Sequence, residues 1–334
     1  MEKVGKQTIK FNNPPTIVDC ASIVGPKEAQ GPLSKYFDQT LDDEFWGEKT
    51  WEKAESKIIK ETVNTVISKS GIPSTQIDCM FAGDLLNQCI SSSFGLRELG
   101  IPFFGVFGAC STFVESLSLG AICAESFANN VLCATSSHFC SAEKQFRFPL
   151  ELGNQRPPTS QWTVTGAGSA ILSKNGNGPY ITHITPGKII DFGIKDGNNM
   201  GAAMAPSFAD TLMTHLLDTG RNPSYYDAII SGDLGYIGKN IAIDILKSNG
   251  YNIKSNYNDC GVLIFDKESQ DTHSGGSGCA CCGTVFSGYL FKQLKDKKIK
   301  RLLLIATGAL MNSTTSQQGE TIPGIAHAIS IETF

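Results

Sequence analysis

The sequence predicts a duplicated α/β fold, in which two similar halves each alternate strands with helices and pack in layers. Three observations predict it: an internal repeat, near-continuous apolar runs typical of buried strands, and helix-length segments between those runs. The chain has 334 residues, of which 41% are hydrophobic, and this is ample for a large core. We expect the first half to span residues 1–175 and the second to span residues 176–334.

The repeat consists of two pairs of similar segments that occur in the same order in both halves. Asp78 to Leu85 matches Asp227 to Leu234 at four of eight positions, and each is an apolar run that ends in Gly-Asp. A buried strand ends in a turn in this way. Leu132 to Thr135 then resembles Leu304 to Thr307, with a longer spacing that requires an insertion in the second half.

Each half reads as strand, helix, strand, helix, strand. The helix from Trp51 to Ser70 carries apolar residues at helical spacing and is stopped by Gly71 and Pro73. The other elements expected in the first half are a strand at Thr16 to Val24, the Asp78 strand, a short helix at Phe94 to Leu99, a strand at Phe103 to Phe107 and a helix from Thr112 to Ala128. In the second half we expect a helix through Phe208 and Leu217 that ends at Gly220, and another from Ile241 to Ser248.

Composition excludes several classes of protein. The formal net charge is −4, so a nucleic acid is not an expected partner, and we interpret the cationic run from Lys292 to Arg301 as a solvated helix face. The sequence lacks an apolar stretch of membrane-spanning length and an apolar signal core after Met1 to Lys10, which favours a cytoplasmic or peripheral membrane protein. The 11 cysteines lie mostly in apolar runs and are interpreted as small buried residues.

Cys110 is the strongest candidate for chemistry. It follows the apolar strand at Phe103 to Phe107 and a small-residue turn, and it precedes the helix that begins near Thr112. Peptide dipoles and unpaired N–H groups at a helix N-terminus favour anions, so a thiolate or a bound carboxylate would be stabilised there. The alternative is a buried structural cysteine at a tight turn.

These features together resemble the thiolase and β-ketoacyl synthase family over nearly the whole chain. The resemblance rests on the duplicated halves, the cysteine turn, the strand from Trp162 to Leu172, and the late Gly-Gly-Ser-Gly turn that precedes a helix and Leu302 to Gly308. It implies a five-layered αβαβα sandwich of two βαβαβ halves. It also implies an active site in which the cysteine works with His and either Asn or a second His.

The sequence departs from this pattern after the second repeated strand. Gly232-Asp-Leu-Gly235 contains no histidine, and an acidic Asp233 in place of a hydrogen-bond donor would repel a forming oxyanion. His273 is the nearest alternative partner, although a lone histidine in a Ser/Gly-rich loop is more often solvated. We therefore expect a pseudoenzyme, with Cys110 as a vestigial nucleophile.

A narrower resemblance covers Ala134 to Glu151, Gln155 to Thr159 and Gln161 to Gly166. These segments are similar to the stage V sporulation protein AD family of spore-forming bacteria. The similarity implies sporulation, binding of dipicolinic acid during its uptake into the developing spore, and a location peripheral to the inner membrane of the spore. The expected partners are other stage V sporulation membrane proteins of the same uptake channel and a second copy in a homodimer. A role in handling the ligand at germination is a further expectation.

Dipicolinate has two carboxylates that flank a pyridine nitrogen, so its site should offer N–H groups, hydroxyls and a cation. The residues expected to supply them are Cys110, Ser111, Thr112, Ser136, Ser137, His138, Arg147, Arg156, Gly276 and Ser277. Each has a structural alternative: the serines can cap a turn, the histidine can be a core residue, the arginines can be surface charges, and the glycines can punctuate a helix–strand junction.

No metal or cofactor is expected besides calcium carried by the ligand. Cys279 and Cys282 have a Cys-x-x-Cys spacing, but Cys260 and His273 do not form the second close pair that structural zinc needs. Three functions remain in competition: a non-catalytic binding protein for dipicolinic acid or its calcium chelate, an acyltransferase or condensing enzyme that uses Cys110, and a scaffold whose pocket is vestigial.

Overall fold

The structure is a computed structural model that describes residues 1–146 and 156–334. Its main sheet contains two sets of five strands in the same spatial order. The first set is β3 (Thr16–Val24), β9 (Gly166–Ser173), β7 (Asn130–Ser137), β5 (Cys79–Gly83) and β6 (Phe103–Gly105). The second set is β10 (Tyr180–Thr185), β15 (Gly324–Glu332), β14 (Arg301–Ala309), β11 (Ala228–Ser231) and β12 (Tyr257–Asp259).

The strand directions repeat as well as the order. In each set the first two pairings are antiparallel and the last two are parallel. The Gly-Asp strands β5 and β11 occupy equivalent places, and so do β7 and β14. The duplication predicted from the sequence is therefore confirmed. The boundary between residues 175 and 176 stays a prediction, because β10 also pairs with β3 and joins the two sets.

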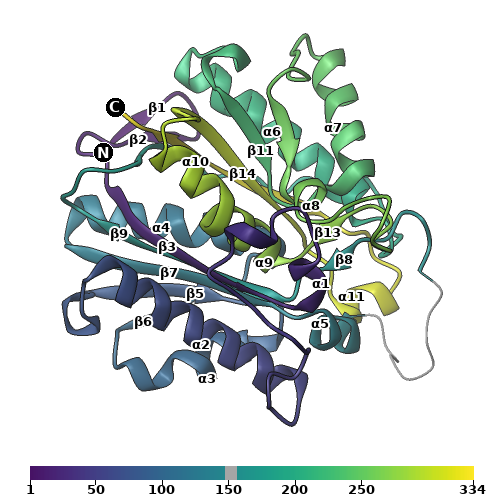
Figure 1. Ribbon diagram of the computed structural model, residues 1–334. Coiled ribbons are helices and arrows are strands. Elements are labelled where there is room, and N and C mark those ends of the chain that lie inside the picture. Colours follow the sequence, from purple (N-terminus) through teal and green to yellow (C-terminus); the bar gives the residue numbers. More distant parts are fainter. Residues whose placement is uncertain (147–155) are drawn as a thin grey trace.

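Helices cover the two sets of strands on both faces (Figure 1). The outer helices of the first set are α2 (Trp51–Ser70) and α3 (Ile90–Leu96), and those of the second set are α6 (Met200–Thr219) and α7 (Gly235–Ser248). Between the sets lie α4 (Thr112–Ser126), α9 (Cys279–Thr284) and α10 (Phe291–Lys295), the last two joined by a π-helical turn. Outer helices, sheet, central helices, sheet and outer helices make the five expected layers.

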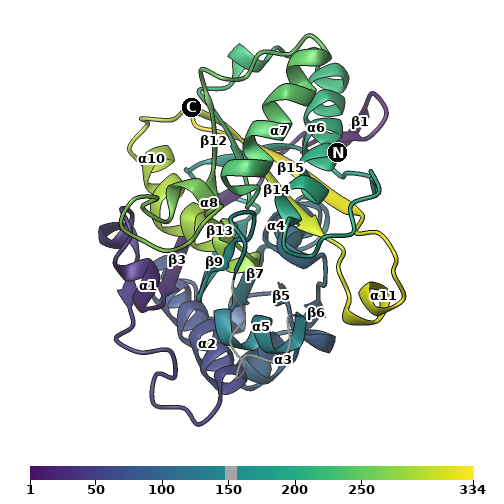
Figure 2. The same cartoon turned by 90° about the vertical axis from the view of Figure 1, so that its right-hand side faces the viewer.

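The remaining elements are short. The helices are α1 (Pro26–Ala29), α5 (Phe139–Phe146), α8 (Cys260–Leu263) and α11 (Ser313–Gln317), and the strands are β1 (Glu2–Val4), β2 (Thr8–Lys10), β4 (Gln39–Thr40), β8 (Trp162–Thr163) and β13 (Gly276–Ser277). In Figure 2, α5 and β13 are on the side that faces the viewer, and β8 pairs with β13 in a small separate sheet. No helix among the described residues combines the length and apolarity needed to cross a membrane.

Local sequence explains most helix boundaries. The Thr50 hydroxyl accepts a hydrogen bond from the Lys53 N–H at the start of α2, and Gly71 ends the helix in the left-handed region at φ 68°. α6 begins at Met200, earlier than the hydrophobic pattern indicated, because Asn199 caps it. The short helix expected at 94–99 starts instead at Ile90 and closes with a 3₁₀ turn.

Candidate ligand-binding site

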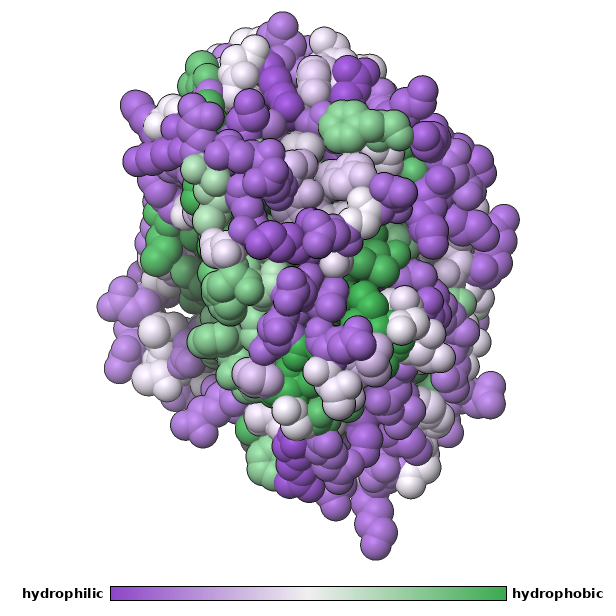
Figure 3. All heavy atoms as spheres, turned by 90° about the vertical axis from the view of Figure 1, so that its left-hand side faces the viewer, coloured by the Kyte–Doolittle hydropathy of each residue, from purple (hydrophilic) through white to green (hydrophobic). Residues whose placement is uncertain are grey.

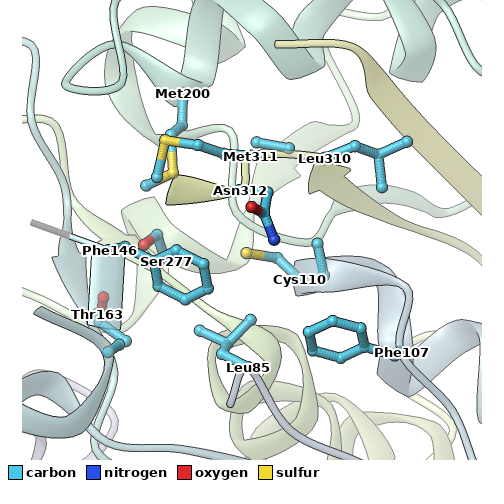
Figure 4. A pocket seen from close by; sticks show the side chains of 13 residues that line it. Leu85, Phe107, Cys110, Phe146, Thr163, Met200, Ser277, Leu310, Met311 and Asn312 are labelled. Carbon is cyan, nitrogen blue, oxygen red and sulfur yellow. The ribbon is translucent and has the colours of Figure 1, made fainter. Parts of the chain in front are cut away.

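Cys110 lies in a tight 3₁₀ turn (Ala109–Ser111) between β6 and α4. Ala109 has φ 51°, a strained left-handed conformation for a residue with a Cβ atom. Two hydroxyls hold the turn: Ser111 donates to the Gly108 carbonyl at 2.6 Å, and Thr112 donates to the Ala109 carbonyl at 2.6 Å. The expected ligand contacts Ser111 and Thr112 thus have structural bonds, while Cys110 faces a cavity (Figure 4).

The cavity has a volume of ≈ 220 Å³ and is lined from both halves of the fold. Its lining residues are Leu85, Phe107, Ala109, Cys110, Ala142, Phe146, Thr163, Met200, Ser277, Ala309, Leu310, Met311 and Asn312. Most are apolar, and four carry polar side-chain groups: a thiol, two hydroxyls and an amide. Ligand pockets usually measure about 300–1,000 Å³, so this cavity suits a small ligand of about one ring.

Asp233 controls the state of the Cys110 thiol. The Cys110 thiol donates to the Asp233 carboxylate, which also accepts hydrogen bonds from the Gly278 N–H at 3.0 Å and the Thr307 hydroxyl at 2.9 Å. Burial and the Asp233 charge both raise the pKa of Cys110 well above its ordinary value. Desolvation and a neighbouring carboxylate thus disfavour the thiolate, one of the two anions expected at this helix position, and leave a bound carboxylate as the other.

Asp233 itself is fully enclosed. Burial raises its pKa to about 7, against the lowering effect of its hydrogen bond from Cys110. Gly278 donates to it from a left-handed conformation at φ 97°, and a side chain at that position would meet the Ser137 hydroxyl at 2.8 Å. The glycine turn that we expected to offer N–H groups to a ligand thus directs the Gly278 N–H to a protein carboxylate.

All five histidines of the chain lie among the described residues, and none lines the cavity. Each has another partner. His138 contacts the Glu44 carbonyl, His183 contacts Thr182, His215 lies between Thr185 and Tyr226, His273 contacts Asp271, and His327 accepts from the Gly187 N–H. His273, considered above as a partner for Cys110, is instead paired with an exposed carboxylate.

Three of the predicted ligand contacts lie outside the cavity, on the segment where β7 ends. The Ser136 hydroxyl donates to Glu55 at 3.0 Å, and the Ser137 hydroxyl donates to the Val164 carbonyl at 2.7 Å. His138 is buried, which lowers its pKa, and it also accepts from the Cys140 N–H. Contact of these side chains with a ligand stays a prediction.

The cation of the site was predicted to come from Arg147 or Arg156. Arg156 donates to the Asp271 carbonyl at 2.8 Å, contacts its carboxylate at 3.2 Å, and lies over the Trp162 ring at 4.8 Å. Arg156 does not line the cavity. Arg147 lies outside the described residues, although it directly follows Phe146, which does line the cavity.

Ser277 and Asn312, both from the second half of the chain, line the cavity together with Cys110. Ser277, a predicted ligand contact, lines the cavity, whereas Gly276 pairs with Trp162 in a small separate sheet. Asn312 was not predicted: its side-chain oxygen caps α11 by accepting from the Thr314 N–H at 2.8 Å, and its amide nitrogen points toward Cys110 (Figure 4). The sequence signal was an Asn-Ser-Thr run after an apolar strand, which is typical of a helix cap.

Glycine allows the second half to approach the cysteine turn. A side chain at Gly308 in β14 would meet the Gly108 carbonyl oxygen at 2.6 Å. Across this contact, the thiol of Cys279 at the start of α9 donates to the Ala109 carbonyl at 3.2 Å. Cys279 and Cys110 thus begin two central helices side by side. Among the described residues, no group of three or more His, Cys, Asp or Glu side chains could hold a metal ion.

Comparisons with known proteins agree with this architecture. The family model described as stage V sporulation protein AD matches residues 5–332. Among curated proteins, stage V sporulation protein AD of Bacillus subtilis (strain 168) is 43% identical over 333 residues, which cover 99% of this chain and 98% of that protein.

Two solved structures show the same fold at low identity. The 3-oxoacyl-[acyl-carrier-protein] synthase III of Aquifex aeolicus VF5 is 12% identical with a TM-score of 0.58, covering 95% of this chain and 99% of that one. A single-substitution variant of Xanthomonas campestris OleA is 13% identical with a TM-score of 0.61, covering 96% of this chain and 99% of that one. The thiolase-like fold predicted from the sequence is thus confirmed.

Proposed function

Because the chain belongs to the stage V sporulation protein AD family, we propose that it binds dipicolinic acid in the Cys110 cavity without turning over thioesters. The ligand enters as the free acid or as its calcium chelate, during uptake into the developing spore. We include in this proposal a role in handling the ligand at germination.

One observation carries the non-catalytic part of the proposal: the Cys110 thiol is hydrogen-bonded to a buried carboxyl in a cavity that no histidine lines. Acyl transfer needs a thiolate and donors aimed at the forming oxyanion, and losing one such donor costs about 10²- to 10³-fold in rate. Asp233 instead raises the pKa of the nucleophile and, when ionised, repels an oxyanion.

The cavity also offers what a small aromatic dicarboxylate needs. Phe107 and Phe146 provide apolar surface for a ring, while Ser277, Thr163 and Asn312 provide hydroxyl and amide donors for carboxylate oxygens. The positive end of the α4 dipole lies beside Cys110. The cation that completes the site is expected from Arg147 or Arg156.

Calorimetry on folded variants tests the proposal. Dipicolinate should bind more tightly than isophthalate, which keeps both carboxylates but lacks the ring nitrogen. Ser277→Ala and Asn312→Leu should each weaken binding by about tenfold, since a hydrogen bond to a charged group contributes about 1.5–3 kcal/mol. Ser68→Ala is the matched control, because Ser68 is exposed on α2 and does not line the cavity. Unchanged affinity in both cavity variants would place the ligand elsewhere.

An active acyltransferase or condensing enzyme is the second candidate. The observation in its favour is that Cys110 opens into a cavity beside the start of α4. Steady release of CoA from acyl-CoA, abolished by Cys110→Ala, would support this function and overturn the non-catalytic one. Slow stoichiometric labelling of the thiol would not.

We also propose that the protein acts at the inner membrane of the spore with other stage V sporulation membrane proteins, as a homodimer. The support for a dimer is β6, which ends the sheet and exposes Phe103 and Phe104 at its edge. Sedimentation of the parent and of Phe104→Lys tests this, and a monomeric parent would refute it.

A further inference from the structure

A second groove of ≈ 580 Å³ lies on the side of the molecule that carries both termini. It is bounded by the start of β3, residues 177–180, α10 and residues 333–334. Its lining residues are Pro14, Ile17, Val18, Asn177, Gly178, Pro179, Tyr180, Phe291, Leu294, Lys295, Lys297, Thr333 and Phe334. We call it the terminal groove.

The terminal groove has an apolar floor and a cationic rim. Ile17, Phe291 and Leu294 are buried beneath it, while Lys295 and Lys297 are exposed at its edge. No acidic side chain of the described residues lines it, although Asp19 lies 3.8 Å from the Lys295 amine. Figure 3 looks onto this side of the molecule, where hydrophobic residues gather between hydrophilic ones. An apolar floor with cations above it fits an amphiphilic anion.

The cations continue beyond the groove. Residues 292–301 contain six lysines and arginines against one acid, Asp296, in a chain whose net charge is −4. The run was expected on a helix face, but α10 ends at Lys295, and Lys297 turns the chain with φ 54°. The Lys298 side chain is 65% exposed, and Lys300 is exposed beside it. Lys298 lies 3.5 Å from Asp296 and Arg301 lies 3.4 Å from Asp227, so the helix end projects an excess of positive charge past the groove rather than a set of unpaired cations.

Resting on the proposed location at the inner membrane of the spore, we propose that the terminal groove and the turn from Lys292 to Lys300 form a docking surface for a membrane that contains anionic phospholipids. Lipid phosphates pair with the lysines, and the half-buried Tyr180 ring and the exposed Phe334 ring rest at the level of the head groups. Charge complementarity and the apolar floor favour a lipid surface over a soluble anion. The negative charge of the rest of the chain orients the molecule with this side toward the membrane.

Vesicle flotation of the full chain tests the proposal. Binding is expected to vesicles of phosphatidylcholine with phosphatidylglycerol, not to phosphatidylcholine alone, and to fall as salt is raised. Reversing three cations in Lys297→Glu, Lys298→Glu and Lys300→Glu together should weaken binding by about 100-fold or more. The matched control is Lys49→Glu, Lys247→Glu and Lys254→Glu, which changes the net charge equally at exposed lysines elsewhere and should retain most binding.

A second variant tests the groove itself. Phe334 is 79% exposed, so Phe334→Ser should weaken vesicle binding severalfold without loss of folding. Equal binding by the two triple variants, or no binding of the parent to anionic vesicles, would overturn the proposal. Equally tight binding of soluble glycerol phosphate would assign the lysines to a free anion instead. Dipicolinate affinity is measured in the same variants and should not change, which separates this surface from the Cys110 cavity.

Discussion

Replacing Asp233 by asparagine should make the protein less sensitive to alkaline pH. The carboxyl is buried and its pKa is raised from the ordinary value of 3.8 to about 7. Such a group stabilises the folded state fully below pH 3.8, and that contribution is lost as pH rises toward 7. Once the carboxyl is fully ionised, the loss amounts to about 4 kcal/mol.

Most of this loss of stability falls within a pH range in which unfolding can be measured. Between pH 5 and pH 8 the parent should lose about 2 to 3 kcal/mol through Asp233, whereas an amide at this position loses nothing by ionisation. The variant also loses part of the hydrogen bonding with Cys110, which lowers its stability by a similar amount at every pH. The test is therefore whether the difference in unfolding free energy between the parent and the variant changes with pH.

Urea denaturation at pH 5, 6, 7 and 8, followed by circular dichroism, measures this difference. Asp244→Asn is the control, because Asp244 is exposed on α7 and the same substitution there leaves the buried carboxyl in place. The other buried carboxyls are present in all three proteins. If Asp233→Asn and the parent keep a constant difference within about 0.5 kcal/mol, Asp233 does not carry a buried charge and the account of Cys110 fails.

Further predictions concern the cavity and its support. Cys110→Trp should abolish dipicolinate binding by filling the cavity, while Cys110→Ala should change calorimetric affinity by no more than about threefold, since a thiol is a weak donor. Binding should be weaker at pH 8 than at pH 6, because Asp233 then gains a charge behind the thiol; the reverse order would contradict its raised pKa. Iodoacetamide should alkylate Cys110 more slowly than a free thiol at pH 7.5, as mass spectrometry can show. Ser136→Ala should lower the unfolding free energy by about 1–3 kcal/mol, because Glu55 loses a buried donor; an unchanged urea midpoint would argue against that bond.

The fold was predictable because its signals are repeated and local. The Gly-Asp ends of β5 and β11 and the apolar runs of β7 and β14 mark equivalent strands in both halves. Capping chemistry set α2 to its observed bounds. The prediction failed at the end of α10, because Lys297 takes a left-handed φ of 54° without the glycine that usually marks a helix end, and the lysine run continues past the last helical residue.

The site was predictable only in part. The pattern of strand, turn and helix indicated Cys110, and the late glycine turn indicated Ser277; both residues line the cavity. Ser136, Ser137 and His138 were expected to contact the same ligand as Cys110. The direction of a side chain at the end of β7 depends on its partners, and the partner of Ser136 is Glu55, which lies 81 residues away in the sequence. Asn312 was missed because its cap is local while its amide faces a turn about 200 residues earlier in the chain.

The Cys110 cavity lies on the seam between the halves, with Leu85 and Phe146 contributed by one and Ser277 and Asn312 by the other. Backbone pairing between the two sets of strands is slight, since β3 and β10 share one paired position, Thr16 opposite Tyr180. A bound ligand contacts both sides of this seam, so its binding free energy opposes their separation. At a ligand concentration 100 times Kd that contribution is about 2.7 kcal/mol. Filling the cavity should therefore slow amide hydrogen exchange in α4 and α9 together.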